Sequence, residues 1–199
     1  MSLIVRLARR AGFIGLFLAA ALMAIALVPA AETLLAQDKG NTEAAELTGT
    51  SQAALEGLYG VTPLAKLLGP KAVAILVFPK VTKAGLGIGG QYGEGALLKK
   101  GAASAYYKTT GASFGLQAGG QQYGYAMFFM NQQALGQLNK ANGFEVGVGP
   151  SVVLVDEGIA KTTTTTTLKD DIYAFVFGQK GLMAGLGIQG NKITQITPK

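Results

Sequence analysis

The chain has 199 residues, of which 49% are hydrophobic and 14% are charged, and its formal net charge is +6. This length and apolarity predict one folded domain with its own core rather than a disordered chain. The chain contains no cysteine and no histidine, which excludes disulfides, thiol nucleophiles, Ser-His and Cys-His catalysis and nearly every zinc site.

The first 30 residues have the layout of a secretory signal. Three arginines lie within residues 1–10, residues 11–28 are apolar and uncharged, and Val28-Pro29-Ala30 provides a small residue before a cleavage point. A positive start, an apolar middle and a small-residue exit are typical of such signals. The apolar run is also just long enough to span a bilayer, so an uncleaved anchor is the alternative. We therefore expect an exported domain that is periplasmic or envelope-associated, with secretion or inner-membrane anchoring as variants.

Residues 31–50 are polar and rich in alanine and predict a linker or a loosely formed helix, so we expect the domain to span residues 51–199. A first helix is predicted over 51–59, where Leu55, Leu58 and Tyr59 share one face.

A second, short helix is predicted to begin at Thr62-Pro63 and to end at Gly69-Pro70. Threonine favours the N-cap position, and proline favours the first helical turn. Three leucines lie on this helix: Leu64, Leu67 and Leu68.

Residues 72–78, with the sequence AVAILVF, predict a buried strand. Gly85, Gly87 and Gly90 then match the G-x-G-x-x-G pattern of dinucleotide-binding loops. In those loops a helix follows the motif directly, with an acidic residue about 20 positions further on. Here the apolar residues alternate with glycine, no good helix follows, and nearly the same letters recur at residues 184–190. The motif therefore predicts a strand and no nucleotide site.

Further short strands are predicted with Lys99-Lys100-Gly101 as a hairpin turn. They lie at residues 95–98, 103–108, 113–120, 123–130, 144–149, 152–155 and 172–177. Asn131 is expected to cap a helix through about residue 140. In total we expect about eight or nine short strands and three helices. Glycines that repeat on one strand face indicate that something packs closely against that face. The predicted fold is α+β, with a glycine-rich antiparallel β-sheet that curls to a barrel or sandwich and N-terminal helices packed on it.

No catalytic set can be assembled from the sequence. The acidic doublets Asp156-Glu157 and Asp170-Asp171 are poor candidates for a carboxylate pair, because adjacent residues on a strand point to opposite faces. No metal-binding motif is visible, and the run of threonines at 162–167 predicts an exposed strand or loop. We expect neither catalysis nor a cofactor.

Positive charge is concentrated in residues 57–144, which hold eight lysines and one acidic residue, Glu94. Such a block favours an anionic partner such as phospholipid head groups; the alternative is that these lysines only keep the surface solvated. Beyond residue 30 there is no arginine, which argues against nucleic-acid binding.

Six stretches of the chain carry a resemblance to a known family. They are, in order, Leu76–Lys80, Lys83–Gly95, Gly111–Gly119, Gly149-Pro150, Asp171–Tyr173 and Lys180–Gly190. Together they resemble the SYLF lipid-binding domain family, in particular its bacterial exported branch. The resemblance covers residues from about 63 to 196 and implies binding of phospholipid or phosphoinositide, and in eukaryotic members work at membranes linked to actin. It also implies that Lys66 and Lys71 fall where the family has its basic, amphipathic membrane-binding region.

We therefore expect a non-catalytic protein of the bacterial envelope that binds anionic phospholipid membranes. A protein–protein scaffold of the envelope, its partners unknown, and a small transmembrane β-barrel are the alternatives. Leu64, Leu67 and Leu68 are candidates for shallow insertion into lipid, with core packing as the alternative. The candidate head-group contacts are Lys66, Lys71, Lys80, Lys83, Lys99 and Lys100.

Overall fold

The computed structural model describes residues 39–140, 143–146, 151–155, 169–181 and 190–198. The predicted signal (1–30), the threonine run (162–167) and most of the repeated glycine motif (184–189) lie outside these residues. By their contacts Glu43–Pro198 form one unit, and the packing below is that of this unit.

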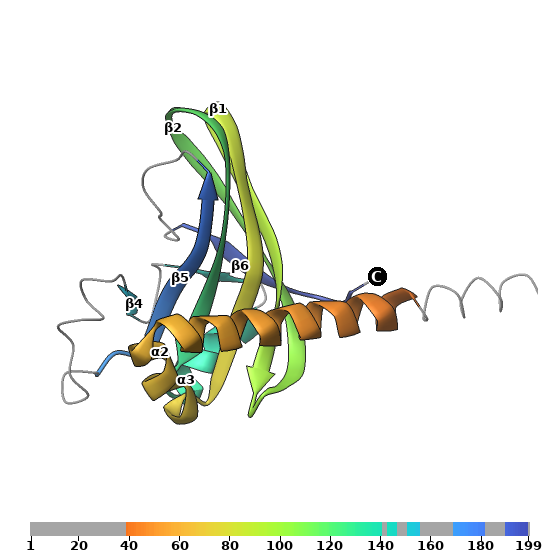
Figure 1. The fold of residues 1–199 in the computed structure, drawn as a ribbon, viewed down its shortest axis with the longest axis vertical. Coiled ribbons are helices and arrows are strands. Elements are labelled where there is room, and N and C mark those ends of the chain that lie inside the picture. Colours follow the sequence, from red (N-terminus) through yellow and green to blue (C-terminus); the bar gives the residue numbers. More distant parts are fainter. Residues whose placement is uncertain (1–38, 141–142, 147–150, 156–168, 182–189, 199) are drawn as a thin grey trace, which may run out of the picture. The chain divides into compact units, whose positions relative to one another are not determined.

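The described part of the N-terminal helix spans residues 39–61 without a break (Figure 1). It therefore includes residues 39–50, for which the sequence predicted a linker or a loose helix. After Thr62 come α2 (Pro63–Leu68) and the 3-10 turn η1 (Gly69–Lys71). Thr62 occupies the predicted N-cap position, but its side chain makes no capping hydrogen bond.

Two very long strands dominate the fold: β1 (Ala74–Lys99) and β2 (Ala102–Phe129). They pair antiparallel along their whole length. Lys100 and Gly101 form the connecting turn with φ of 50° and 82°, which is the geometry of the tight hairpin turns that match strand twist. The predicted hairpin is confirmed. The short strands predicted within 72–98 and 103–130 are not separate, because they join into β1 and β2.

The β1–β2 ribbon bends over near its middle, so that its two halves face each other (Figure 1). Irregularities in register interrupt the pairing between Phe78 and Val81 and between Leu86 and Ile88, and such bulges bend a strand. Gly93 lies against the first half of its own strand: a Cβ added there would be 2.7 Å from the carbonyl oxygen of Lys80. The expected close packing on glycine is confirmed, and its partner is the same strand.

The remaining strands extend the sheet in the order β3-β6-β2-β5-β4, with β1 on β2. All pairs are antiparallel except β4 with β5, which are parallel. The predicted α+β fold with a curled sheet is therefore confirmed, and the sheet is mixed at one edge. The bounds are β3 (Phe144–Glu145), β4 (Val152–Val155), β5 (Ile172–Gly181) and β6 (Lys192–Ile196).

Apolar side chains bury both faces of the ribbon. Leu76 and Phe78 belong to the inner cluster, whereas Ile75 and Val77 belong to the outer one. Residues 43–61 of the N-terminal helix and α2 cover the outer cluster, and α3 (Gln132–Gly136) with η2 (Gln137–Asn139) packs on the inner one. Burial on both faces explains why residues 72–78 form a continuous apolar run.

Candidate lipid-binding surface

α2 and η1 form a short element with one buried side and one exposed side. Leu64, Ala65 and Leu68 pack into the outer core, whereas Leu67 is 44% exposed. Of the three leucines predicted to meet lipid, two therefore pack in the core and Leu67 alone faces outward. The core-packing alternative accounts for Leu64 and Leu68.

An aromatic pair holds this element on the sheet. The ring of Tyr59 meets Phe128 edge-on with centroids 6.4 Å apart, and it also covers Gly69, where an added Cβ would lie 2.8 Å from Cζ of Tyr59. Burial and the neighbouring Glu56 carboxylate raise the pKa of Tyr59. Glycine at 69 lets η1 lie directly against this ring.

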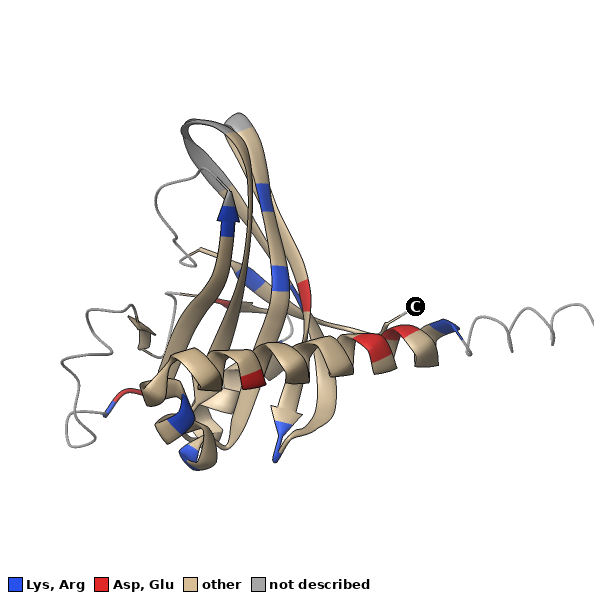
Figure 2. Ribbon diagram, viewed as in Figure 1, with Lys and Arg blue, Asp and Glu red and all other residues tan. Residues whose placement is uncertain are grey.

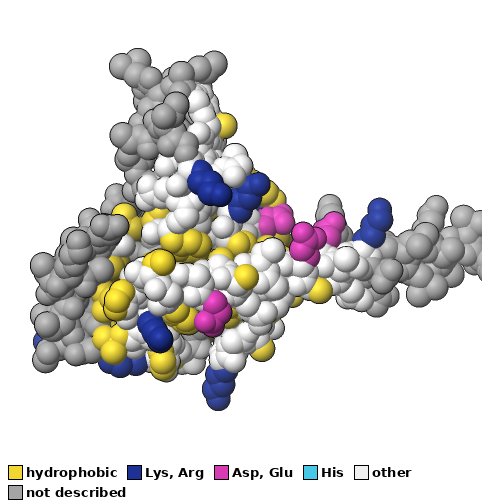
Figure 3. Space-filling model, viewed as in Figure 1, with side chains coloured by type: hydrophobic (Ala, Val, Ile, Leu, Met, Phe, Trp, Pro, Cys, Tyr) yellow, Lys and Arg dark blue, Asp and Glu magenta, His cyan; other side chains and the backbone are white. Residues whose placement is uncertain are grey.

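The exposed side of this element combines apolar and cationic groups. Val61, at the end of the N-terminal helix, is 76% exposed and Leu67 is 44% exposed, and Lys66 and Lys71 are exposed beside them. Figure 3 shows hydrophobic and lysine side chains next to one another at this end of the molecule. We call Val61, Lys66, Leu67 and Lys71 the α2 tip. Apolar groups among lysines are typical of surfaces that lie on anionic membranes.

The six candidate lysines fall into separate groups (Figure 2). Lys66 and Lys71 lie on α2 and η1, Lys99 and Lys100 at the hairpin turn, and Lys80 and Lys83 higher on β1. Lys80 lines a hollow together with Tyr92 and Glu94, so a carboxylate lies close to it. No carboxylate lies on α2 itself. Cationic and apolar exposure therefore coincide at the α2 tip, and they also coincide at Lys80 and the 50% exposed Tyr92, where a carboxylate is present as well.

The N-terminal helix connects the hairpin turn to the α2 tip. The side-chain amide of Gln52 donates a hydrogen bond of 2.7 Å to the carbonyl oxygen of Gly101. Nine residues separate Gln52 from Val61, which is about 14 Å along a helix. The turn lysines and the α2 tip are thus separate contacts, and one phosphate group cannot bridge them.

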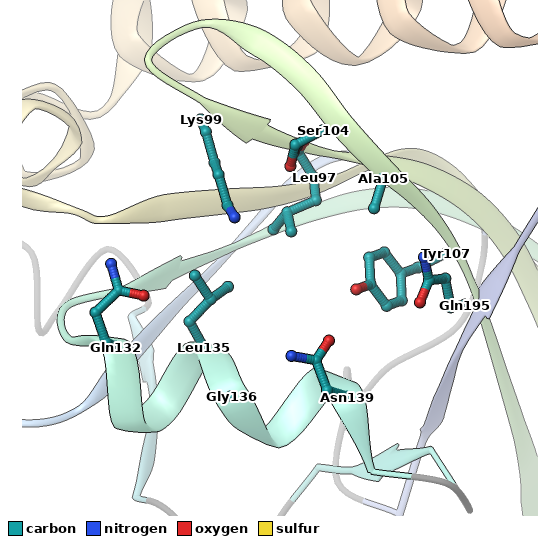
Figure 4. Close-up of a pocket in the computed structure, with 10 residues that line it drawn as sticks. All are labelled: Leu97, Lys99, Ser104, Ala105, Tyr107, Gln132, Leu135, Gly136, Asn139 and Gln195. Carbon is teal, nitrogen blue, oxygen red and sulfur yellow. Dashed lines mark hydrogen bonds between the residues drawn. The ribbon is translucent and has the colours of Figure 1, made fainter.

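Lys99 also lines a pocket, as Figure 4 shows. The ends of β1 and β2 form one wall, α3 and η2 form the opposite wall, and Gln195 of β6 borders one side. Tyr107 lies in the pocket wall and is only 2% exposed. Burial raises the pKa of its hydroxyl, which keeps the group protonated as a hydrogen-bond donor.

A second group of polar side chains is buried on the inner face of the ribbon. Tyr123 donates a hydrogen bond of 2.7 Å to the Gln91 side-chain oxygen, and the Gln91 amide donates to Oδ1 of Asn191. Tyr125 donates to Oγ1 of Thr109 at 2.7 Å. Burial raises the pKa of Tyr123 to about 12 and raises that of Tyr125 as well. These bonds join the two halves of the bent ribbon.

Residues 110–197 match the family model Ysc84, described as Las17-binding protein actin regulator. This part of the chain is therefore similar to the Ysc84 (SYLF) domain family. SYLF domains are binding domains that are associated with lipid and with actin-related functions. A search of curated proteins found no match.

The SYLF match covers most of β2 and the elements that follow it, whereas the α2 tip and β1 precede the matched residues. Within the described residues, no helix has the length and apolarity to cross a bilayer. The same residues contain no cluster of three or more His, Cys, Asp or Glu side chains that would hold a metal ion.

Sequence reasoning missed the polar residues around the pocket. Single glutamines and asparagines carry no motif, and their positions in α3, η2 and β6 come together only through the sheet order. β6 itself was not predicted, because the two isoleucines of Lys192–Ile196 are three positions apart and do not show the period of two that indicates a strand. The residues missed are Tyr107, Gln132, Asn139 and Gln195.

Proposed function

We propose that this SYLF protein binds anionic phospholipid membranes without catalysis, as an exported protein of a bacterial envelope. The α2 tip is the observation that carries the proposal, because it presents Val61 and Leu67 next to Lys66 and Lys71. The association of SYLF domains with lipid supports it, and the signal-like layout of residues 1–30 supports export.

Electrostatic attraction supplies much of the proposed affinity. A lysine near an anionic surface contributes about 1 kcal/mol, and none of the six candidate lysines forms an ion pair with a described residue. Leu67 and Val61 add shallow apolar contact. The turn lysines Lys99 and Lys100 form a second contact about 14 Å or more along the helix from the tip.

The test is co-sedimentation of the full chain with vesicles of phosphatidylcholine alone or mixed with phosphatidylglycerol. We expect binding that requires the anionic lipid and weakens at high salt, because screening shortens the reach of surface charges. The double variant Lys66→Glu/Lys71→Glu should bind roughly 30-fold more weakly, from about 1 kcal/mol for each lysine.

A matched control separates a specific surface from net charge. Lys180→Glu/Lys192→Glu makes the same change in charge at two exposed positions, one on β5 and one on β6. Equal weakening by both double variants would show that only total charge matters and would overturn the α2 tip as the site. Absence of vesicle binding in the unchanged protein would overturn the lipid proposal and favour a protein–protein scaffold, the function that the family description suggests for its named member.

A further inference from the structure

The pocket beside Lys99 has the size and the composition of a small-ligand site. Its volume is about 310 Å³, which is at the lower end of the range for small-molecule sites. Leu97 and Leu135 are buried at its base, 4% and 7% exposed. The pocket is too small and offers too little apolar surface to hold a lipid acyl chain.

The polar groups around the pocket are rich in hydrogen-bond donors. They comprise the Lys99 ammonium, the Tyr107 hydroxyl and the side-chain amides of Gln132, Asn139 and Gln195, and no carboxylate lines the pocket. Figure 4 shows Lys99 extending from the β1 end toward Gln132 and Leu135. A cation with several neutral donors and no acid favours an anionic, oxygen-rich ligand.

These donors are free to bind a ligand. None of the three amides nor the Tyr107 hydroxyl forms a hydrogen bond with another described residue, whereas Ser104 at the rim already donates to the carbonyl oxygen of Leu97 at 3.2 Å. The Tyr107 side chain is 2% exposed, but its hydroxyl is not one of the fully buried polar atoms that lack a partner, so it is accessible from the pocket. A ligand oxygen in the pocket would accept from it.

We propose that this pocket binds a phosphoryl group joined to a small hydroxylated unit, the chemistry of a glycerophospholipid head group. Lys99 supplies the charge, the amides of Gln132, Asn139 and Gln195 donate to the phosphoryl and hydroxyl oxygens, and Tyr107 donates at the base. The inference deepens the proposed function, since it rests on lipid binding to assign a head group to this site. Lys99 thereby differs from its neighbour Lys100, which lies in the turn and does not line the pocket.

The test measures binding of soluble probes to the full chain by NMR. No vesicles are present, so the pocket is tested without any contribution from membrane binding. Glycerol 1-phosphate is titrated while the side-chain amide signals of Gln132, Asn139 and Gln195 are recorded, and inorganic phosphate is titrated in parallel. We expect saturable shifts confined to these signals. Lys99→Met should weaken binding at least 10-fold and Tyr107→Phe several-fold, whereas Lys180→Met, at an exposed lysine of β5 that does not line the pocket, should weaken it less than 2-fold.

The two titrations distinguish the sources of the phosphoryl group. Tighter binding of glycerol 1-phosphate supports a lipid head group as the ligand, and equal binding of inorganic phosphate supports a phosphoryl site for free phosphate. Equal losses in Lys99→Met and Lys180→Met, or no saturable shift with either probe, would overturn the proposal. The vesicle assay with Lys66→Glu/Lys71→Glu tests the proposed function separately, so a failure of the pocket proposal can be distinguished from a failure of membrane binding.

Discussion

The two faces of the β1–β2 ribbon are both buried, but they are built from different chemistry. The outer face holds aliphatic and aromatic side chains under the N-terminal helix and α2, as in Val77, Leu98 and Phe128. The inner face mixes Phe78 and Met127 with hydroxyl and amide groups. The outer face thus gains stability from area removed from water, whereas the inner face depends on close backbone approach and on hydrogen bonds between the ribbon's halves.

The largest expected effect lies on the inner face, at Gly95. A Cβ there would be 2.8 Å from Cδ1 of Phe78 and closer still to the carbonyl oxygen of Val77. Gly95→Val would push the two halves of the ribbon apart, and we expect a loss of about 4 kcal/mol or more in the free energy of unfolding. Urea denaturation followed by circular dichroism measures it.

Gly57 provides the control for this substitution. It lies exposed in the N-terminal helix with nothing within 4 Å of an added Cβ, so Gly57→Ala should stabilise the protein by about 1 kcal/mol. A destabilisation by Gly95→Val no larger than about 1 kcal/mol would contradict the close contact between the halves.

A pair of aromatic truncations compares the faces directly. Phe128 on the outer face is fully buried and meets Phe175 edge-on at 4.9 Å, so Phe128→Ala should cost about 3–5 kcal/mol. Tyr125→Phe on the inner face keeps the ring and removes only the hydroxyl that donates to Thr109. We expect it to cost about 1–3 kcal/mol. Both losses are measured as shifts in the urea midpoint. A larger loss in Tyr125→Phe than in Phe128→Ala would contradict the view that the outer face is stabilised mainly by buried apolar area.

The last expected effect is absent at neutral pH, appears only in alkali and again concerns the inner face. Burial raises the pKa of Tyr123 from 10 to about 12, so its neutral form stabilises the fold fully below pH 10. That contribution is lost as the pH rises toward 12, a loss of roughly 3 kcal/mol. Tyr123→Phe should therefore lose less stability than the unchanged protein between pH 8 and pH 11.5. Equal losses of free energy of unfolding in the two proteins over this pH range would show that ionisation of Tyr123 is not linked to unfolding.

Local chemistry explains which elements could be predicted from the sequence. The turn at Lys100-Gly101, the Asn131 cap and the strand Val152–Val155 each follow from residues within a few positions, and the structure has all three. The Asn131 side chain accepts a hydrogen bond of 2.8 Å from the amide of Ala134. Such signals require no knowledge of the rest of the fold.

Long-range packing explains what could not be predicted. Pro79 and Lys80 look like the end of a strand, yet they lie in an irregularity that bends β1 without ending it. Leu64 and Leu68 are buried and Leu67 is exposed because of the side on which α2 packs against the sheet, and the sequence of α2 alone does not determine that side. The pocket residues come from β1, β2, α3, η2 and β6, so no single stretch of sequence predicts that they lie together.

The hairpin turn also sets an order in which the ribbon can assemble. Lys99 pairs with Ala102 across three positions, whereas Ala74 pairs with Phe129 across 55. Loop closure costs about 0.6 kcal/mol for each doubling of length, so the far end carries an entropic penalty roughly 2.5 kcal/mol larger. We expect β1 and β2 to pair first at the turn and then progressively away from it. The β1–β2 wall of the pocket beside Lys99 would then form before the core beneath the N-terminal helix is packed.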